Sequence, residues 1–188
     1  MESLAIIAEF NPFHTGHARL IRQVRQAAGP EAAIVIIMSG AFVQRGEPAF
    51  FDKWHRAAWA IDGGADVVIE LPAVYALSSA AGFAQGGVTL AARLGCQALA
   101  CGVEGGTAAD FLSLARRSEG LTACLKAAKK SSAGQQLTDA LMAAAPDEAR
   151  LLPQPNALLA VEYARAMVKQ DPPLPCLPLR RQGRPGAP

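Results

Sequence analysis

Short apolar runs alternate with longer mixed stretches in the first part of the chain. The apolar runs are residues 4–8, 34–38, 67–70 and 98–102. Runs this short, without alternating polar positions, are typical of parallel strands that are buried on both faces. The stretches between them are rich in Ala, Arg, Leu and Gln, and they predict helices over residues 16–28, 52–61 and 79–94.

This alternation of strand and helix is the rhythm of βαβ units with right-handed connections. The sequence therefore predicts the α/β class and a Rossmann-like, open parallel sheet. Beyond residue 107 helical patterns follow one another, over residues 110–117, 121–129, 137–144 and 157–169. A last strand is expected at residues 177–180, although Pro178 interrupts it.

The same patterns divide the chain into three regions. Residues 1–106 are expected to form the Rossmann-like core, and residues 107–170 a small helical segment packed on that core. Residues 171–188 would add the last strand and a tail. The tail, residues 180–188, offers little to bury, so we expect it to fray.

Composition narrows the class of protein without identifying a partner. Of the 188 residues 51% are hydrophobic, which is enough for one buried core. The net charge of +2 is too even to indicate a nucleic-acid surface by itself. The longest aliphatic run, residues 32–38, is too short to cross a membrane, and no basic segment opens a secretory signal. A cytoplasmic protein is therefore expected.

The cysteines agree with that location. Cys96, Cys101, Cys124 and Cys176 form no CxxC pair and have no histidine close to them in the sequence. Reduced thiols are expected rather than a zinc site or a disulfide framework. The sequence indicates no metal ligand supplied by the protein.

The most informative segment is EFNPFHTGH, residues 9–17, between the first predicted strand and the first predicted helix. Ligands of open α/β sheets bind at the carboxyl ends of strands, where helix N-termini attract phosphates. His14 and His17 can donate hydrogen bonds there to charge that develops on a transferred phosphate, and Gly16 would let a nucleotide approach the backbone. The alternative is structural, with His14 capping the helix and His17 packing against a strand.

This HxGH motif resembles that of the HxGH nucleotidyltransferase superfamily. Further blocks narrow the resemblance to the bacterial tRNA(Met) cytidine acetate ligase family. They are SGAFVQRGEPA (39–49), DKWHRA (52–57), DVVIELP (66–72), FAQG (83–86), CGVE (101–104), PNALLAVEY (155–163) and RRQG (180–183). The resemblance covers nearly the whole chain.

The resemblance implies an ATP-dependent ligase with two steps. Acetate and ATP, which arrives with Mg²⁺, would give acetyladenylate and pyrophosphate. The wobble cytidine of elongator tRNA(Met) would then take the acetyl group and become N4-acetylcytidine. His14 and His17 are the expected catalytic residues. The residues expected to bind ATP are Ile7, Ala8, Glu9, Phe10, Asn11, Pro12, Phe13, His14, Thr15, Gly16, His17, Ala18, Arg19, Leu20, Gly102, Asn156 and Arg181.

Three residues of that set have ordinary alternatives. Gly102 ends a predicted strand, where it either gives a ligand room or merely forms a turn. Asn156 precedes a predicted helix, so contact with the nucleotide competes with a plain N-cap role. Arg181 would pair with a phosphate or lie solvated on the surface.

Arg45 and Lys53 follow the second predicted strand and would hold phosphate or tRNA backbone, unless they are solvated loop charges. We predict that Trp54 and Trp59 pack in the core or against a helix rather than stack on bases. Asp52 is expected to cap the second helix.

Asp66 and Glu70 flank the third predicted strand and could approach Mg²⁺ at its carboxyl end, but they lack the spacing of a metal site. No metal ligand is therefore predicted.

The chain also departs from the family pattern. Members of the family continue well beyond the position that matches Pro188, so a truncated fragment or a shifted reading frame is expected. Val103 and Ala41 stand where the family usually has serine and asparagine. These departures leave open a non-catalytic nucleotide-binding or RNA-binding fragment. The HxGH motif alone also allows an adenylyltransferase that acts on a small molecule, although the blocks at 39–49 and 52–57 argue against it.

Overall fold

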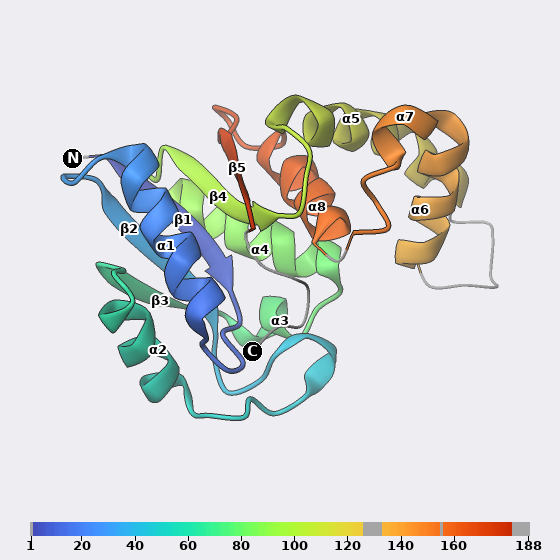
Figure 1. Ribbon diagram of the computed structural model, residues 1–188. Coiled ribbons are helices and arrows are strands. Elements are labelled where there is room, and N and C mark those ends of the chain that lie inside the picture. The colour runs from blue at the N-terminus through green and yellow to red at the C-terminus, as the bar shows by residue number, and fades with distance from the viewer. Residues whose placement is uncertain (1, 126–132, 155, 182–188) are drawn as a thin grey trace.

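The computed structural model describes residues 2–125, 133–154 and 156–181. Within these residues, five strands form one sheet in the order β3-β2-β1-β4-β5, and every neighbouring pair is parallel (Figure 1). The strands are β1 (Ser3–Ala8), β2 (Ala33–Ser39), β3 (Val67–Leu71), β4 (Ala98–Val103) and β5 (Cys176–Arg180). The predicted α/β class and the open parallel sheet are confirmed.

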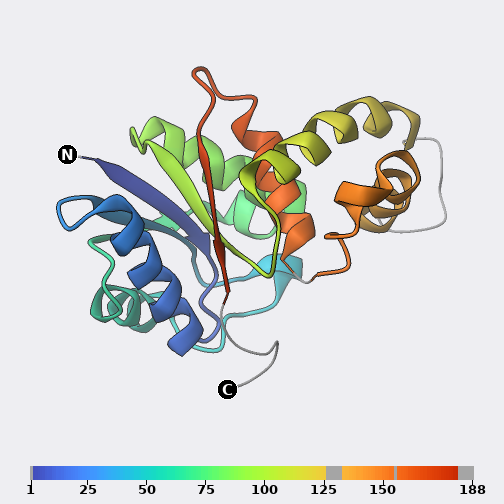
Figure 2. The ribbon, with the colours of Figure 1, turned by 45° about the horizontal axis from the view of Figure 1, so that its top comes forward.

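The strand order reverses beside β1, because the chain first builds β2 and β3 on one side and then β4 and β5 on the other. Two connections that leave in opposite directions open a crevice at the carboxyl ends of β1 and β4. Figures 1 and 2 show the β1–α1 turn, the end of β5 and the chain after β2 at this same edge of the sheet.

Helices cover both faces of the sheet. The helices are α1 (Thr15–Ala28), α2 (Lys53–Asp62), α3 (Ala73–Ala76), α4 (Ala80–Arg93), α5 (Ala108–Leu125), α6 (Ala133–Ala144), α7 (Pro146–Ala149) and α8 (Ala157–Met167), with one 3₁₀ turn, η1 (Gln44–Gly46). α1 and α2 cover one face, whereas α4 and α8 cover the other; α6 and α7 lie farthest from the sheet (Figures 1 and 2).

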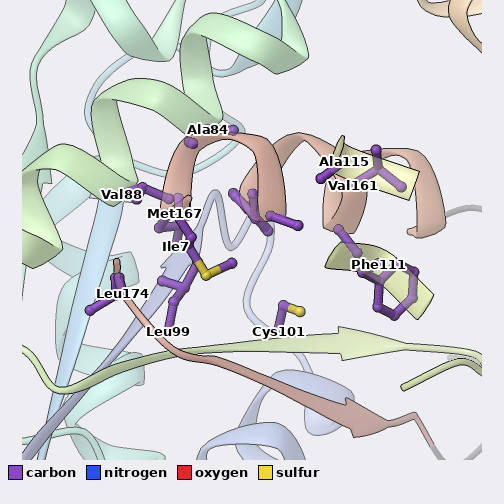
Figure 3. Close-up of a cluster of buried hydrophobic side chains, with 14 of the residues drawn as sticks. Ile7, Ala84, Val88, Leu99, Cys101, Phe111, Ala115, Val161, Met167 and Leu174 are labelled. Carbon is purple, nitrogen blue, oxygen red and sulfur yellow. The ribbon is translucent and has the colours of Figure 1, made fainter. Parts of the chain in front are cut away.

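Successive residues of the central strands enter two different cores. Leu4 and Ile6 of β1 pack in the core under α1, whereas Ala5 and Ile7 pack in the core under α4 and α8. Figure 3 shows the second core, in which Ile7 lies near Val88 and Met167. Because both faces are covered, residues 4–8 of β1 and 34–38 of β2 are apolar throughout, as is typical of a buried parallel sheet.

The third strand is less buried than expected. Val67 is exposed, and Leu71 is the buried residue of β3. The prediction of burial on both faces is wrong here because β3 is an edge strand and has no neighbour on one side. The same reasoning explains Pro178 in β5, since an edge strand tolerates a missing N–H.

The helical segment differs from the prediction in several places: α6 begins earlier than expected, and the short helix α7 was not predicted. Predicted helices at 110–117 and 121–129 are one continuous helix, α5, as far as Leu125, and residues 126–129 lie outside the described part. In the predicted tail Arg180 belongs to β5, and the Arg181 N–H donates to the Val103 carbonyl (2.7 Å). Fraying is thus wrong for these two residues, and residues 182–188 lie outside the described part.

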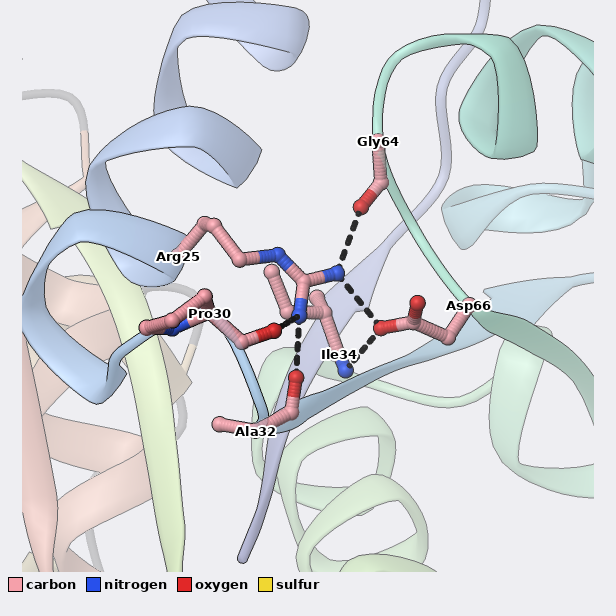
Figure 4. A network of polar contacts seen from close by, with 6 residues as sticks. All are labelled: Arg25, Pro30, Ala32, Ile34, Gly64 and Asp66. Atoms are coloured by element: carbon pink, nitrogen blue, oxygen red, sulfur yellow. Dashed lines mark hydrogen bonds and ion pairs between the residues drawn. The ribbon is translucent and has the colours of Figure 1, made fainter.

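Arg25 links α1 to the amino ends of β2 and β3 through hydrogen bonds (Figure 4). Its guanidinium donates to the carbonyls of Ala32 and Gly64 and to the Asp66 carboxylate (2.6 Å), which also accepts the Ile34 N–H (2.7 Å). Burial opposes ionisation of Asp66, but these hydrogen bonds and the charge of Arg25 lower its pKa overall. Asp66 directly precedes β3, so it lies at the amino ends of the strands, opposite the crevice. The idea that it approaches Mg²⁺ at the carboxyl end is therefore wrong.

Candidate active site

The turn between β1 and α1 carries the HxGH motif into the crevice. Phe10 anchors this turn: it is buried and adopts a φ of 51°, a backbone conformation that is strained for a residue with a side chain. Its ring meets Phe13 edge-on at 5.0 Å and lies 4.7 Å from the His17 ring. The strained turn is thus held from the protein side by aromatic contacts.

His14 and His17 cap the first helix together. His14 is the N-cap residue, and its Nδ1 accepts the Gly16 N–H (3.0 Å). In return Nδ1 of His17 accepts the His14 N–H (3.3 Å), which completes a reciprocal capping box. The structural alternative for His14 is therefore confirmed, but it engages only one nitrogen of each ring.

Both imidazoles are neutral near pH 7. Burial lowers the pKa of His17 to about 3, helped by the charges of His14 and Arg181. Partial burial and Arg181 also lower the pKa of His14. Because each Nδ1 accepts a hydrogen bond, the proton of each neutral ring belongs on Nε2. The motif thus supplies two Nε2–H donors without supplying positive charge.

Gly16 is required by His14 itself. A Cβ at this position would lie 2.9 Å from Cε1 of the His14 ring. The ring of His14 occupies the space beside this glycine, and the approach of a nucleotide to the backbone at Gly16 stays a prediction.

Arg181, Glu104 and Asn156 meet at the carboxyl end of β4. The Asn156 side-chain amide donates to Glu104 Oε1 (2.5 Å), and Arg181 Nη1 lies 4.0 Å from the same oxygen. Since Arg181 lowers the pKa of both histidines, its positive charge acts on the HxGH motif. The structure thus brings together residues that are far apart in the sequence.

The structure also bears on the ordinary roles considered for Gly102, Asn156 and Arg181. Gly102 lies inside β4 rather than in a turn, and a Cβ there would lie 3.2 Å from Arg181 Cγ. Asn156 occupies the N-cap position of α8, yet its side chain makes no capping hydrogen bond and turns to Glu104 instead. Arg181 is exposed, with its charge near Glu104.

The remaining residues of the expected ATP stretch take different positions. Ile7 faces the core, where a Cβ on Gly87 would collide with it. Asn11 accepts the Phe50 N–H through Oδ1 (2.7 Å), and Glu9 accepts the Gln44 N–H (2.6 Å). Leu20 Cδ2 would lie 3.6 Å from a Cβ on Gly102. Ala8 ends β1, Pro12 lies in the turn, and Thr15, Ala18 and Arg19 lie in the first turns of α1.

Two important residues escaped the sequence analysis. Arg56 is fully buried and donates to the carbonyls of Phe51 (3.0 Å), Glu9 (2.6 Å) and Gly40. It therefore joins the turns after β1 and β2 to the start of α2. The second is Glu104, which links Asn156 and Arg181. An arginine in a block that resembles a family motif, and a carboxylate directly after a strand, are signals that could have found them.

Lys53 and Glu70 form an ion pair at this edge of the sheet, with Nζ and Oε2 2.5 Å apart. Lys53 is thus not simply solvated, and Glu70 already has a cationic partner. A Cβ on Gly40 would lie 2.0 Å from Glu70 Oε1, so the glycine makes room for this carboxylate. Arg45 lies in η1, and its side chain is outside the described part.

Asp52 caps α2 as predicted, accepting the N–H groups of Trp54 (2.9 Å) and His55 (3.0 Å). Trp59 packs edge-on against Phe51 at 5.0 Å, in agreement with the packing role. The predicted packing is wrong for Trp54, whose side chain is 75% exposed because the first turn of α2 directs it away from the sheet. Val103, in contrast, is a buried core residue of β4.

Among the described residues, no group of three or more His, Cys, Asp or Glu side chains could hold a metal ion. No helix in that same part of the chain is both long enough and apolar enough to span a membrane.

A parallel sheet with a capped HxGH turn at its topological switch point is the arrangement typical of a nucleotidyl transferase. The family model described as HIGH Nucleotidyl Transferase matches residues 1–186, so the chain belongs to this family. The family resemblance inferred from the motifs is confirmed.

The names of individual relatives are more specific than the description of the family. The chain is 41% identical to the tRNA(Met) cytidine acetate ligase of Syntrophomonas wolfei, over 97% of this chain and 46% of the relative. It is 40% identical to the enzyme of that name from Streptococcus equi, over 97% and 48%. The crystal structure of Thermotoga maritima TmcAL bound with alpha-thio ATP superimposes with a TM-score of 0.86 at 31% identity, over 97% and 47%. The chain thus spans about half the length of these relatives.

Proposed function

We propose that this chain activates acetate with ATP and passes the acetyl group to the wobble cytidine of elongator tRNA(Met). The observation that carries the proposal is the stacked pair His14 and His17, whose ring centroids lie 3.7 Å apart at the switch point of the sheet. Two neutral Nε2–H donors and the nearby Arg181 are suited to bind charge on a leaving pyrophosphate. The names of the relatives supply the acetate and the tRNA.

In the first step an acetate oxygen attacks the α-phosphorus of ATP, and the bond from that phosphorus to the bridging oxygen of pyrophosphate breaks. The bond's electron pair leaves with pyrophosphate, where negative charge builds. Such a step needs positioning and charge stabilisation rather than a strong base. We assign the charge stabilisation to the Nε2–H groups of His14 and His17 and to Arg181.

In the second step the exocyclic amine of cytidine attacks the acetyl carbon. The carbon–oxygen bond to AMP breaks, AMP keeps the electron pair, and the amine loses a proton. The positioned, activated acyl group makes a protein nucleophile unnecessary.

The binding residues follow the same proposal. The turn and first helix from Ile7 to Leu20, with Gly102, Asn156 and Arg181, would hold ATP, which brings Mg²⁺ with it. Lys53 and Arg45 would contact phosphate or the tRNA backbone. We place the reaction in the cytoplasm, where ATP and tRNA meet.

The test is acetate-dependent exchange of labelled pyrophosphate into ATP by the folded chain with Mg²⁺. The proposal requires exchange with acetate and none without it. Calorimetric binding of ATP without exchange would instead indicate a non-catalytic nucleotide-binding fragment. Exchange that depends on a phosphorylated small molecule instead of acetate would indicate an adenylyltransferase of another kind.

A further inference from the structure

The segment between β2 and the first turn of α2 exposes four aromatic side chains. Phe50 is 83% exposed and Trp54 75%, and Phe42 and Phe51 are also exposed. We refer to these four residues as the aromatic surface. Large apolar side chains that stay exposed close together along one segment often mark a binding site, because each would be more stable if it were covered.

The exposure is not the result of a loose backbone. Phe42 pairs with Pro48 in an antiparallel bridge, and the Ala49 N–H donates to the Ala41 carbonyl (2.9 Å). Farther along, the Phe50 N–H donates to Asn11. The segment is thus held by hydrogen bonds, although the side chains of Phe50 and Trp54 are largely exposed to solvent.

The aromatic surface adjoins the candidate active site. Phe50 is bonded to Asn11, which lies three residues before His14 in the HxGH turn. The buried Arg56 binds the carbonyls of both Phe51 and Glu9, so the two segments share one support. Lys53, which is paired with Glu70, places its Nζ 5.3 Å from the Trp54 ring centre.

We propose that the aromatic surface is a stacking platform for unpaired bases of the RNA substrate. This inference rests on the proposed function: a cytidine amine that reaches an acyl group beside His14 must come from a base outside a double helix, which leaves the flat faces of that base and its neighbours uncovered. Aromatic rings beside a cation stack on such bases with little regard to sequence. Asp52 and Lys53 lie between these aromatic residues in the sequence. A dry contact with a second copy of the chain would have to bury their charges, so it is the less favourable use of this surface.

The direct probe is the fluorescence of Trp54 in a Trp59→Phe variant, where it is the tryptophan that remains. A stem-loop RNA with an unpaired cytidine in its loop is expected to quench this emission. A blunt duplex of the same composition is expected to quench it much less, because its bases are already stacked.

Variants test the affinity for the same stem-loop. Phe50→Ala and Trp54→Ala should each weaken binding about tenfold. Trp54→Phe should restore most of the affinity, whereas Trp54→Leu, which stays apolar but lacks a flat ring, should not. Leu94→Ala is the control, since Leu94 is an exposed apolar residue that follows α4 and precedes β4, at the amino ends of the strands.

Acetate-dependent pyrophosphate exchange, measured on the same samples without RNA, separates the two proposals. Unchanged exchange with weakened RNA binding supports the platform. Failure of the wild-type chain to bind the stem-loop, or equal affinity in every variant, overturns it. A concentration-dependent dimer that Trp54→Ala abolishes would assign the surface to a second copy instead. Loss of exchange in the wild-type chain would count against the proposed function alone.

Discussion

The rings of His14 and His17 stack at 3.7 Å while each accepts a backbone N–H through Nδ1. The helix cap and the proposed chemistry thus use different nitrogens of the same two rings. Substitutions can therefore remove the proposed chemical role and keep the helix cap.

Asparagine at position 14 and glutamine at position 17 should keep the cap, because both types are favoured at the N-cap and N3 positions. We expect His14→Asn and His17→Gln to change the free energy of unfolding little, and to raise the adenylation barrier by about 2 to 4 kcal/mol because an Nε2–H donor is lost. Single-turnover adenylation and denaturant unfolding measure the two effects.

The alanine variants provide the contrast. His14→Ala should lose the cap as well, at about 1 kcal/mol of stability, in addition to the slower adenylation. ATP affinity should fall less than the rate in all four variants, including His17→Ala. Normal adenylation in any of them would remove that histidine from the proposed chemistry.

The low pKa of His17 predicts how stability depends on pH. The folded state holds the pKa near 3, whereas the unfolded chain titrates near 6.5, so between these values the unfolded state binds more protons. The contribution of His17 to stability is therefore full above pH 6.5 and is lost as the pH falls toward 3. The free energy of unfolding should decline more steeply with acid in the wild type than in His17→Gln, by up to about 1.4 kcal/mol per pH unit. Parallel curves would contradict the buried, neutral imidazole.

Gly16→Ala should separate activity from stability. The new methyl group would force the His14 ring from its place 2.9 Å away, so we expect adenylation to fall. Loss of the cap should be largely offset by the better helix propensity of alanine, about 1 kcal/mol in the opposite direction. A variant with unchanged kinetics would show that the ring position over Gly16 is unimportant.

Arg56→Met should destabilise the fold by about 3 kcal/mol or more, because one buried and two partly buried carbonyl oxygens lose their donor. It should also slow adenylation, since Glu9 and Gly40 begin the turns that form the site. Denaturant unfolding measures the stability of Arg56→Met. The control is Arg22→Met, which changes an exposed arginine of α1. Equal stability of the two variants would mean that other contacts hold these turns.

The sequence predicted the sheet well because the apolar runs of β1, β2 and β4 reflect burial on two faces, which is a local signal. It did not predict the exposure of Val67, because the edge position of β3 depends on strand order. The convergence of Asn156 and Arg181 on Glu104 depends on the packing of α8 beside β4 and β5, which no local pattern contains. The packing predicted for Trp54 is wrong because sequence spacing does not show which side of a helix turn faces solvent. The three-region division of the chain stays a prediction.

The most direct measurement follows the oxygen atoms of acetate. The chain is incubated with ATP, Mg²⁺, acetate labelled with oxygen-18 in both positions, and hydroxylamine to accept the acetyl group. If acetate attacks the α-phosphorus, the AMP released must carry one oxygen-18 atom, which mass spectrometry detects. AMP that contains only ordinary oxygen, or no acetate-dependent AMP from a folded sample, would contradict the account.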